Sequence, residues 1–221
     1  MIEWVHERVS RARSVGRVLV ATDDERIIEE CRRFGAEVRL TRADHPTGTD
    51  RVAEAAAAET ADIIVNAQGD EPLIDPAAID SAVAPLLWGA SPAASLAPMA
   101  TLKKRIRDPL DLENPNVVKV VTNLAGRAVY FSRSLIPFPR DRDPTEHFKH
   151  IGLYVYRREF LLAYPKLPVG PLERAEKLEQ LRAIENGHSI QVVETEYEAV
   201  GVDTPEDLER VRKLLEVSIH G

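Results

Sequence analysis

The sequence predicts a single α/β domain spanning residues 1–221, whose mixed, mainly parallel sheet is flanked by helices. In the first 87 residues, short runs rich in β-branched residues alternate with amphipathic helical segments, which is the pattern of βαβ units. A chain of 221 residues forms one large domain or two small ones, since domains have ~100–200 residues. The sequence contains no repeat, low-complexity tract or long linker that would divide it, so we expect one domain.

The first part of the chain supplies the alternating elements. Ile2, Val5 and Val9 recur at helical spacing, and Gly35 is placed to end a second helix as its C′ residue. Asp75 before Pro76 predicts an N-cap followed by proline at the first helical position. The expected elements here are a helix from Ile2 to Ala12, a strand at Arg17–Ala21, a helix at Ile27–Phe34, a strand at Val38–Thr41, a helix at Asp50–Glu59, a strand at Ile63–Asn66 and a helix at Pro76–Leu87.

The middle of the chain is richer in strands. We expect a β-rich excursion at about residues 93–156 that serves substrate and dimer contacts, with a charged, proline-rich loop at Pro137–Pro144. Beyond it the pattern returns to helix, strand and helix. The expected elements are strands at Ala93–Met99, Val117–Thr122, Ala128–Phe131 and His150–Tyr156, a helix at Pro171–Asn186, a strand at Ser189–Glu194 and a helix at Thr204–Val217.

Composition excludes several classes of protein. The 29 Lys and Arg residues against 36 Asp and Glu give a net charge of −7, which argues against a wholly basic binder of nucleic acid or of an anionic membrane. Cys31 is the only cysteine, so no intrachain disulfide can form, as suits a reducing compartment. No apolar run approaches the ~20 residues of a membrane span, and the first twelve residues contain no secretory signal. We expect a cytoplasmic protein without nucleic-acid or membrane partners.

Two acidic residues are candidate metal ligands. Asp70 follows a predicted strand in the loop Asn66–Pro72, where a carboxylate would suit Mg²⁺, although an Asx-type turn before Pro72 explains it equally well. Thr204 is a good N-cap for the last helix, which leaves Asp203 without a structural role. Taken alone, Asp203 is better explained as an acid favoured by the helix dipole.

A basic segment in this acidic chain points to an anionic small molecule. Residues 127–158 contain seven Lys or Arg and three Asp or Glu, a local charge of +4. Within it, His150, Gly152 and Tyr154 share one face of a predicted strand and would suit a polyhydroxylated ligand, although an ordinary half-exposed strand has the same pattern. Arg140 lies on the proline-rich loop, where its guanidinium could clamp a carboxylate or phosphate.

A turn before the third predicted helix is a candidate nucleotide site. Thr47, Gly48 and Thr49 precede Arg51, and backbone amides at a helix start suit a nucleotide phosphate. The neighbouring Asp-His pair does not have zinc-ligand spacing. Glu179 and Gln180 lie on the predicted helix Pro171–Asn186, and their pattern alone indicates no function.

Seven ordered segments resemble one family nearly end to end, the cytidylyltransferases that activate 3-deoxy-manno-octulosonate (Kdo). This resemblance implies a Rossmann-like fold of the nucleotide-diphospho-sugar transferase type and a homodimer. The segments are TRADHPTGTDR (41–51), VNAQGDEP (65–72), NPNVVKVV (114–121), YFSRSLIPFPRDR (130–142), KHIGLYVYR (149–157), PLERAEKLEQLR (171–182) and GVDTPEDL (201–208).

The resemblance also implies a reaction and its residues. The anomeric hydroxyl of Kdo attacks the α-phosphate of CTP, which releases pyrophosphate and gives CMP-Kdo for lipopolysaccharide biosynthesis. By carry-over, Asp70 and Asp203 hold Mg²⁺, and together with Arg140 they are the catalytic candidates. The implied Kdo pocket consists of Gln68, Arg140 (on the carboxylate), His150, Tyr154, Glu179 and Gln180, and the implied cytidine site of Thr47, Gly48, Thr49 and Arg51.

One departure from the family concerns the N-terminus. The family opens with a strand and a Gly-, Arg- and Lys-containing loop around the triphosphate, whereas Met1 and Ile2 match the start of its first helix. We therefore expect the first, central strand to be missing and the chain to be inactive or weakened. Two alternatives are a non-catalytic sugar-binding or assembly module, and a cytidylyltransferase for a related sugar acid such as an amino analogue of Kdo. The strand at 150–156 and the Arg140 loop favour Kdo over sialic acid.

Overall fold

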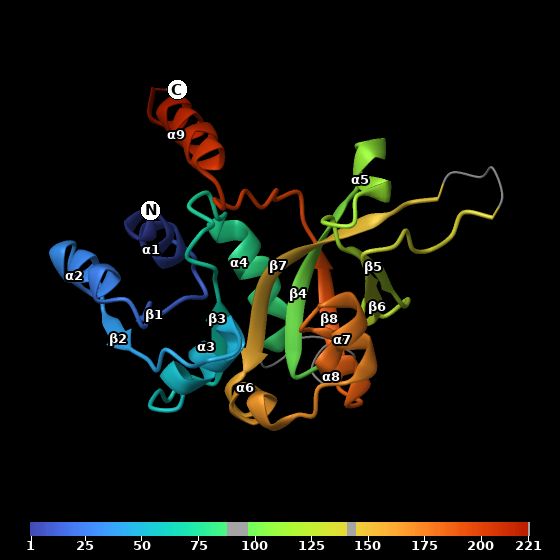
Figure 1. The fold of residues 1–221 in the computed structure, drawn as a ribbon, viewed down its shortest axis with the longest axis horizontal. Helices are drawn as coiled ribbons and strands as arrows, with labels where there is room; N and C mark the ends of the chain where they lie inside the picture. The colour runs from blue at the N-terminus through green and yellow to red at the C-terminus, as the bar shows by residue number, and fades with distance from the viewer. Residues whose placement is uncertain (88–96, 141–144, 221) are drawn as a thin grey trace.

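A mixed sheet covered by helices on both faces forms the centre of the molecule, and a smaller two-stranded sheet lies near the N-terminus (Figure 1). The computed structural model describes residues 1–87, 97–140 and 145–220. The elements in chain order are α1 (Ile2–Ser10), β1 (Val20–Thr22), α2 (Glu25–Arg33), β2 (Val38–Leu40), α3 (Gly48–Ala56), β3 (Ile63–Asn66), α4 (Pro76–Val83), η1 (Ala84–Leu86), β4 (Met99–Arg105), α5 (Pro109–Glu113), β5 (Lys119–Thr122), β6 (Ala128–Ser132), β7 (Phe148–Arg157), α6 (Arg158–Ala163), η3 (Tyr164–Lys166), α7 (Pro171–Glu176), α8 (Leu181–Glu185), β8 (Ile190–Glu194) and α9 (Pro205–His220).

Strand β7 is the hub of the main sheet. The strands follow the order β6-β5-β7-β4-β8, and β3 pairs with the C-terminal half of β7, where Asn66 lies opposite Tyr154. β3, β4 and β8 run in one direction, because β3 and β4 both pair antiparallel with β7 while β4 pairs parallel with β8. The mixed α/β sheet flanked by helices is therefore confirmed. β7 lies between β3 and β4 and runs against both, so antiparallel pairings outnumber parallel ones among the described strands. The prediction "mainly parallel" therefore describes the common direction of β3, β4 and β8 and not the pairing of neighbouring strands.

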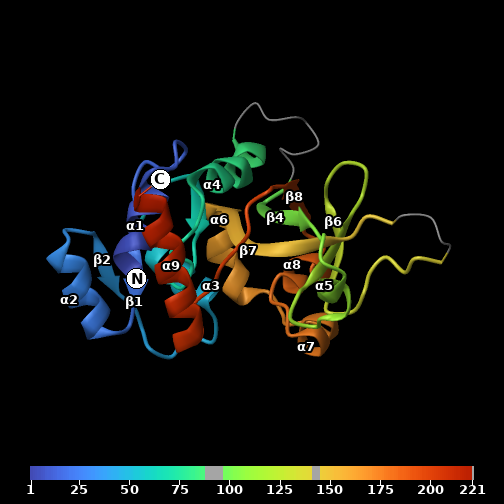
Figure 2. The same ribbon diagram turned by 90° about the horizontal axis from the view of Figure 1, so that it is seen from above.

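The two faces of the sheet bury separate apolar clusters. Alternating side chains of β7 divide between them, so that Leu153 and Val155 pack with α1 and α4, while Tyr156 packs with α3, α6 and α8. Figure 2 shows α4 and α7 on opposite sides of β7. Each face is therefore closed by its own layer of helices. Within the described residues, no helix is long and apolar enough to cross a membrane.

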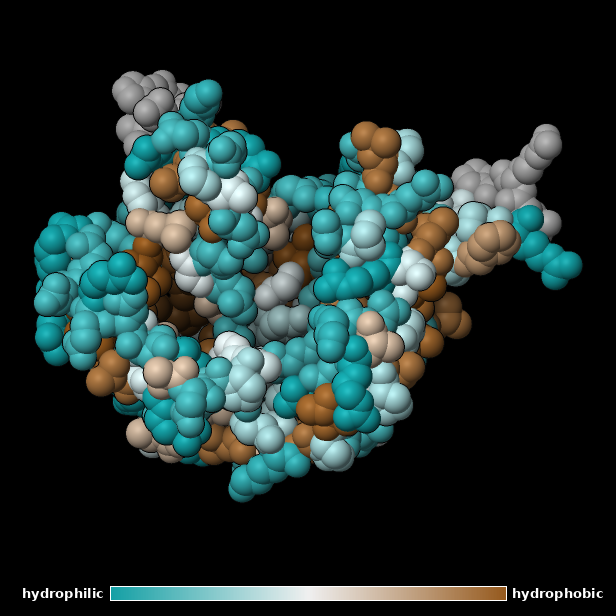
Figure 3. All heavy atoms as spheres, in the orientation of Figure 1, coloured by the Kyte–Doolittle hydropathy of each residue, from teal (hydrophilic) through white to brown (hydrophobic). Residues whose placement is uncertain are grey.

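The two-stranded sheet is separate from the main one. β1 pairs in parallel with β2, and in the described part of the chain no ladder joins either strand to β3. Contacts of α1 with α4 and of α3 with β1 and β3 connect the two regions instead. Figure 3 shows hydrophobic side chains at the bottom of a hollow between the α2–β2 region and the centre of the molecule. The expectation that a first strand is missing from the sheet stays a prediction.

Most predicted elements agree with the structure to within a few residues, but the helix predicted over Pro171–Asn186 is wrong. The structure has two short helices there, α7 and α8, because Lys177 adopts a left-handed conformation (φ 55°) that ends α7. Glu179 and Gln180 consequently lie in the connection between helices. The strand predicted at Ala93–Met99 is also misplaced, since β4 runs from Met99 to Arg105, and residues 93–96 lie outside the described residues.

Candidate active site

The loops that carry Asp70 and Asp203 meet beyond the end of β3. The backbone N–H of Val202 donates to the carbonyl oxygen of Asp70 at 3.0 Å. The predicted N-cap is confirmed as part of a capping box, since Thr204 Oγ1 accepts from the N–H of Asp207 at 3.2 Å and the Asp207 carboxylate accepts from the N–H of Thr204 at 3.1 Å. Because Thr204 and Asp207 satisfy the helix start, the Asp203 carboxylate is left over, as the sequence indicated.

The pair has the character of a magnesium site. Neither the half-buried Asp70 nor the exposed Asp203 uses its carboxylate in a hydrogen bond or ion pair with the described residues. Mg²⁺ binds one or two carboxylates and fills its other positions with phosphate and water, so this donor set fits it. The described residues contain no cluster of three or more His, Cys, Asp or Glu side chains suited to a metal.

Glu71 lies next to this pair and is held by Tyr197. The Tyr197 hydroxyl donates to Glu71 Oε2 at 3.1 Å, and the tyrosine ring is buried. Burial and the neighbouring Asp70 charge raise the pKa of Glu71 above its usual range. The sequence analysis did not single out either residue, and nothing in the local pattern joins them.

A polar face of β7 adjoins the acidic loops. His150, Gly152 and Tyr154 are half-buried, while the alternating Leu153 and Val155 are buried in the core, which confirms the predicted two-faced strand. The pairing with β4 slips at this point, because its Thr101 lies opposite Tyr154 while Leu102 lies opposite Ile151. Gly152 and Leu153 are thus left without opposing residues, and such bulges re-aim side chains beside functional sites.

Buried Thr101 fixes the state of the His150 ring. Its hydroxyl is 2.8 Å from the carbonyl oxygen of Leu153 and 2.9 Å from His150 Nε2. Because the single hydroxyl hydrogen is used on a carbonyl, Nε2–H donates to Thr101 Oγ1, which leaves Nδ1 as an acceptor. Burial lowers the pKa of His150 to about 3, so the ring is neutral at physiological pH.

The connection between α7 and α8 places two further polar residues against this face. Tyr154 donates from its hydroxyl to Gln180 Oε1 at 3.2 Å, and Tyr164 donates to the backbone carbonyl of Glu179 at 2.7 Å. Burial raises the pKa of the Glu179 carboxyl. Glu179 Oε1 and Gln180 Nε2 are buried and have no hydrogen-bond partner among the residues that the structure describes. Buried polar atoms are normally satisfied, so an acceptor and a donor are available here for a ligand.

The predicted nucleotide turn contacts the predicted sugar pocket. Thr47 caps α3 by accepting from the N–H of Asp50 at 3.2 Å, and Gly48 begins the helix with an exposed backbone. The hydroxyls of Thr47 and Thr49 also face the Glu179 carboxylate and lower its pKa against the effect of burial. The turn and the sugar candidates are therefore neighbours.

Tyr156 is a further neighbour of these groups and stands outside the predicted site residues. Its hydroxyl lies near Thr49, and its ring is buried on the same side of β7 as Tyr154. The alternation that grouped His150 and Tyr154 also includes position 156, so this signal was present in the sequence.

Among the described residues, the side chains of three other candidates form no hydrogen bond or ion pair with these groups. The Arg51 side chain donates to Thr41 Oγ1 at 2.6 Å and pairs with Asp23 at 3.1 Å. Gln68 is half-buried in the loop before Asp70. Arg140 is exposed on the segment after β6. Their roles stay predictions.

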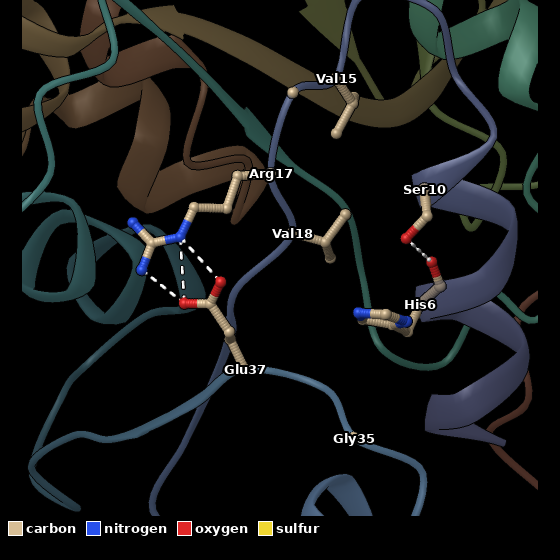
Figure 4. Close-up of a pocket in the computed structure, with 8 residues that line it drawn as sticks. His6, Ser10, Val15, Arg17, Val18, Gly35 and Glu37 are labelled. Atoms are coloured by element: carbon tan, nitrogen blue, oxygen red, sulfur yellow. Dashed lines mark hydrogen bonds and ion pairs between the residues drawn. The ribbon is translucent and has the colours of Figure 1, made fainter.

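Two cavities of about 290 and 390 Å³ lie elsewhere, beside α1. Figure 4 shows the first, in which Arg17 is paired with Glu37 while His6 and Ser10 line the opposite wall. No predicted site residue lines either cavity. The candidate active site thus lies on one face of β7 and beside the loop that follows β3, and it is distinct from these cavities.

Comparisons with known proteins identify relatives over the whole chain. The family model described as cytidylyltransferase matches residues 1–190. A 3-deoxy-manno-octulosonate cytidylyltransferase of Solibacter usitatus is 62% identical over 99% of this chain and 85% of the relative, and one of Geobacter sulfurreducens is 55% identical over 97% and 88%.

A solved structure shares the fold closely. A CMP:2-keto-3-deoxy-manno-octonic acid synthetase complexed with CTP superposes with a TM-score of 0.91 at 40% identity, over 98% of this chain and 88% of that one. Identity at this level over almost the whole chain reflects common descent. The chain therefore belongs to the cytidylyltransferase family, among the 3-deoxy-manno-octulosonate cytidylyltransferases.

Proposed function

We propose that this chain transfers a cytidylyl group from CTP to the anomeric hydroxyl of Kdo, giving CMP-Kdo and pyrophosphate for lipopolysaccharide synthesis in the cytoplasm. One observation carries the proposal beyond family membership. Asn66, the last residue of β3, lies opposite Tyr154, so the loop that carries Asp70 leaves the sheet beside the polar face of β7. Unsatisfied carboxylates and an array of hydroxyl-binding groups are therefore neighbours, as a reaction between a triphosphate and a sugar requires.

The reaction forms an O–P bond at the α-phosphorus and breaks the bond to the pyrophosphate leaving group. Both reactants are anions, so the chain must neutralise charge and hold the attacking oxygen in line. Mg²⁺ held by Asp70 and Asp203 would supply this neutralisation when bound. We assign Arg140 to the Kdo carboxylate, because a guanidinium matches a carboxylate in two-point geometry.

The sugar pocket would recognise hydroxyl groups by paired donors and acceptors. Gln180 Nε2 offers a buried donor and Glu179 Oε1 a buried acceptor, and neither atom has a hydrogen-bond partner in the described part of the chain. The neutral His150 offers Nδ1 as an acceptor, while its low pKa of about 3 makes it a poor general base at pH 7. His150 would therefore orient a sugar hydroxyl, with Tyr154 and Gln68 completing the pocket.

The nucleotide would lie along the start of α3. Gly48 and Thr49 begin this nine-residue helix at its positive end, and the exposed Gly48 offers a backbone N–H that suits phosphate or ribose oxygens. Arg51 is fixed by Asp23 on the adjoining β1–α2 loop, and we assign it to the cytidine side of the site.

We further propose that the chain is a homodimer. The segment around the β5–β6 hairpin exposes large hydrophobic side chains, and Figure 3 shows hydrophobic atoms gathered at that end of the molecule. Such a group of exposed apolar residues is typical of a protein interface. These residues are Leu110 (80% exposed), Leu124 (109%), Val129 (55%) and Phe138 (82%).

Release of pyrophosphate from CTP in the presence of Kdo and Mg²⁺ tests the proposed activity. We expect Asp70→Asn and Asp203→Asn to abolish turnover, and Glu179→Gln to raise the KM for Kdo more than that for CTP. An amino analogue of Kdo and sialic acid, tested in parallel, identify the preferred sugar. Binding of Kdo without binding of CTP or release of pyrophosphate would overturn the proposal in favour of a sugar-binding module.

A further inference from the structure

The chain between β8 and α9, residues 195–203, determines where Asp203 lies. This segment contains neither helix nor strand, so it has no ladder of backbone hydrogen bonds to fix its path. Figure 1 shows it crossing from the end of β8 to the start of α9, past the loop that follows β3. Its position must therefore come from individual contacts with its neighbours.

Tyr197 supplies the central contact. Its ring is 8% exposed and packs in the same apolar cluster as Val5 of α1 and Ile74. From this fixed position its hydroxyl donates to Glu71 Oε2 at 3.1 Å. Removing the hydrogen-bond donor of a partly buried carboxylate costs free energy of folding. This bond therefore holds the segment that carries Tyr197 against the loop that carries Glu71.

A second bond lies five residues further on. The N–H of Val202 donates to the carbonyl oxygen of Asp70 at 3.0 Å. The two bonds involve residues next to the two aspartates, because Glu71 directly follows Asp70 and Val202 directly precedes Asp203. A slip of one residue in an extended segment moves it by ~3.3 Å, which would break both bonds.

We infer that Glu71 and Tyr197 are positioning residues that set the separation of Asp70 and Asp203. The inference rests on the proposed role of these two aspartates in holding Mg²⁺. The Glu71 carboxylate accepts a hydrogen bond from Tyr197 in the segment before Asp203. We therefore expect Glu71 to hold that segment in place and not to be a metal ligand. Residues that orient metal ligands change metal affinity by ~10–100-fold when they are substituted.

The experiment uses Mn²⁺ as the probe, measured by water-proton relaxation in the complex of the full chain with CTP and without Kdo. Tyr197→Phe keeps the ring and removes the hydroxyl, and Glu71→Gln keeps the shape and removes the charge. We expect each variant to weaken Mn²⁺ binding roughly tenfold. The double variant should be no weaker than either single variant, because both changes remove the same contact.

Tyr130→Phe is the matched control. The Tyr130 hydroxyl also lies near a carboxylate, that of Glu176, at 3.5 Å, but on the β6 side of the molecule. We expect it to leave Mn²⁺ binding unchanged. Melting curves for every variant ensure that the titrations are made at a temperature well below that of unfolding. The Mg²⁺ concentration for half-maximal activity should rise across the variants in the same order as the Mn²⁺ dissociation constant.

Asp70→Asn and Asp203→Asn separate failure of the inference from failure of the proposed site. If they abolish Mn²⁺ binding while Tyr197→Phe and Glu71→Gln leave it unchanged, the positioning role is wrong and the metal site stands. If the aspartate variants bind Mn²⁺ normally, the proposed metal site is wrong and the inference falls with it. Losses that add fully in the double variant would also overturn the inference, since the two residues would then act separately.

Discussion

His150 allows a sharp prediction about stability in acid. Its pKa is lowered from 6.5 to about 3 by burial, with no charged side chain contributing. The rings of Phe131 and Tyr154 lie 5.0 and 5.4 Å from it, and Thr101 hydrogen-bonds to Nε2. An unfolded chain protonates this histidine near pH 6.5 while the folded chain does not, so acidification favours unfolding.

The size of the effect follows from the two pKa values. Between pH 7 and pH 5 the protonated fraction of this histidine rises from about a quarter to nearly all in the unfolded state and stays near zero in the folded state. At 1.36 kcal/mol per pH unit, the free energy of unfolding should fall by about 2 kcal/mol over this range. The loss begins as the pH falls through 6.5 and continues until about pH 3, where the folded protein takes up the proton. His150→Gln, which has no titrating group but retains an amide near the Thr101 hydroxyl, should lack this loss.

Urea unfolding of both proteins at pH 7, 6 and 5 measures the difference. Glu71 and Glu179 have raised pKa values and therefore act in the opposite direction, but they are present in both proteins and cancel in the comparison. Because burial is the cause, the difference should not depend on salt. Equal losses in the wild type and in His150→Gln would refute the assignment of a neutral, buried histidine.

Three further outcomes are expected. Glu173→Gln should lower the free energy of unfolding by about 3 kcal/mol in urea titrations, because it leaves the buried guanidinium of Arg182 without the carboxylate that it contacts at 2.6 Å. Thr101→Val should raise the KM for Kdo while leaving that for CTP unchanged, and Thr101→Ser should restore it, since the hydroxyl orients His150. Thr204→Ala should lower the melting temperature through a loss of about 1 kcal/mol, the usual contribution of an N-cap.

Local signals explain which elements could be predicted. Asp75 caps α4 and Gly35 has the positive φ expected after α2, and both follow from chemistry within a few residues. The break at Lys177 has no such signal, because the segment around it consists of good helix formers. The buried ion pair between Glu173 and Arg182 joins the two short helices there. The spacing of apolar residues along the sequence cannot predict a contact of this kind.

The same distinction applies to the candidate site. Asp203 could be singled out by elimination, since Thr204 and Asp207 satisfy the helix start between them. Tyr197 could not, because its partner Glu71 is 126 residues away in the sequence. The residues that carry the chemistry stand in recognisable motifs, whereas the residues that hold them in place are set by tertiary contacts.

The contacts of Glu179 change how the site is divided. Motif resemblance assigns Thr47 and Thr49 to the nucleotide and Glu179 to the sugar, yet the two hydroxyls face the Glu179 carboxylate and lower its pKa. Thr49 also lies near Tyr156, which is on the same side of β7 as Tyr154. Because residues assigned to the nucleotide adjoin a residue assigned to the sugar, the geometry of each subsite depends on the other. A bond must form between the two substrates, and a shared wall of hydroxyl and carboxylate groups is one way in which the fold can hold them in register.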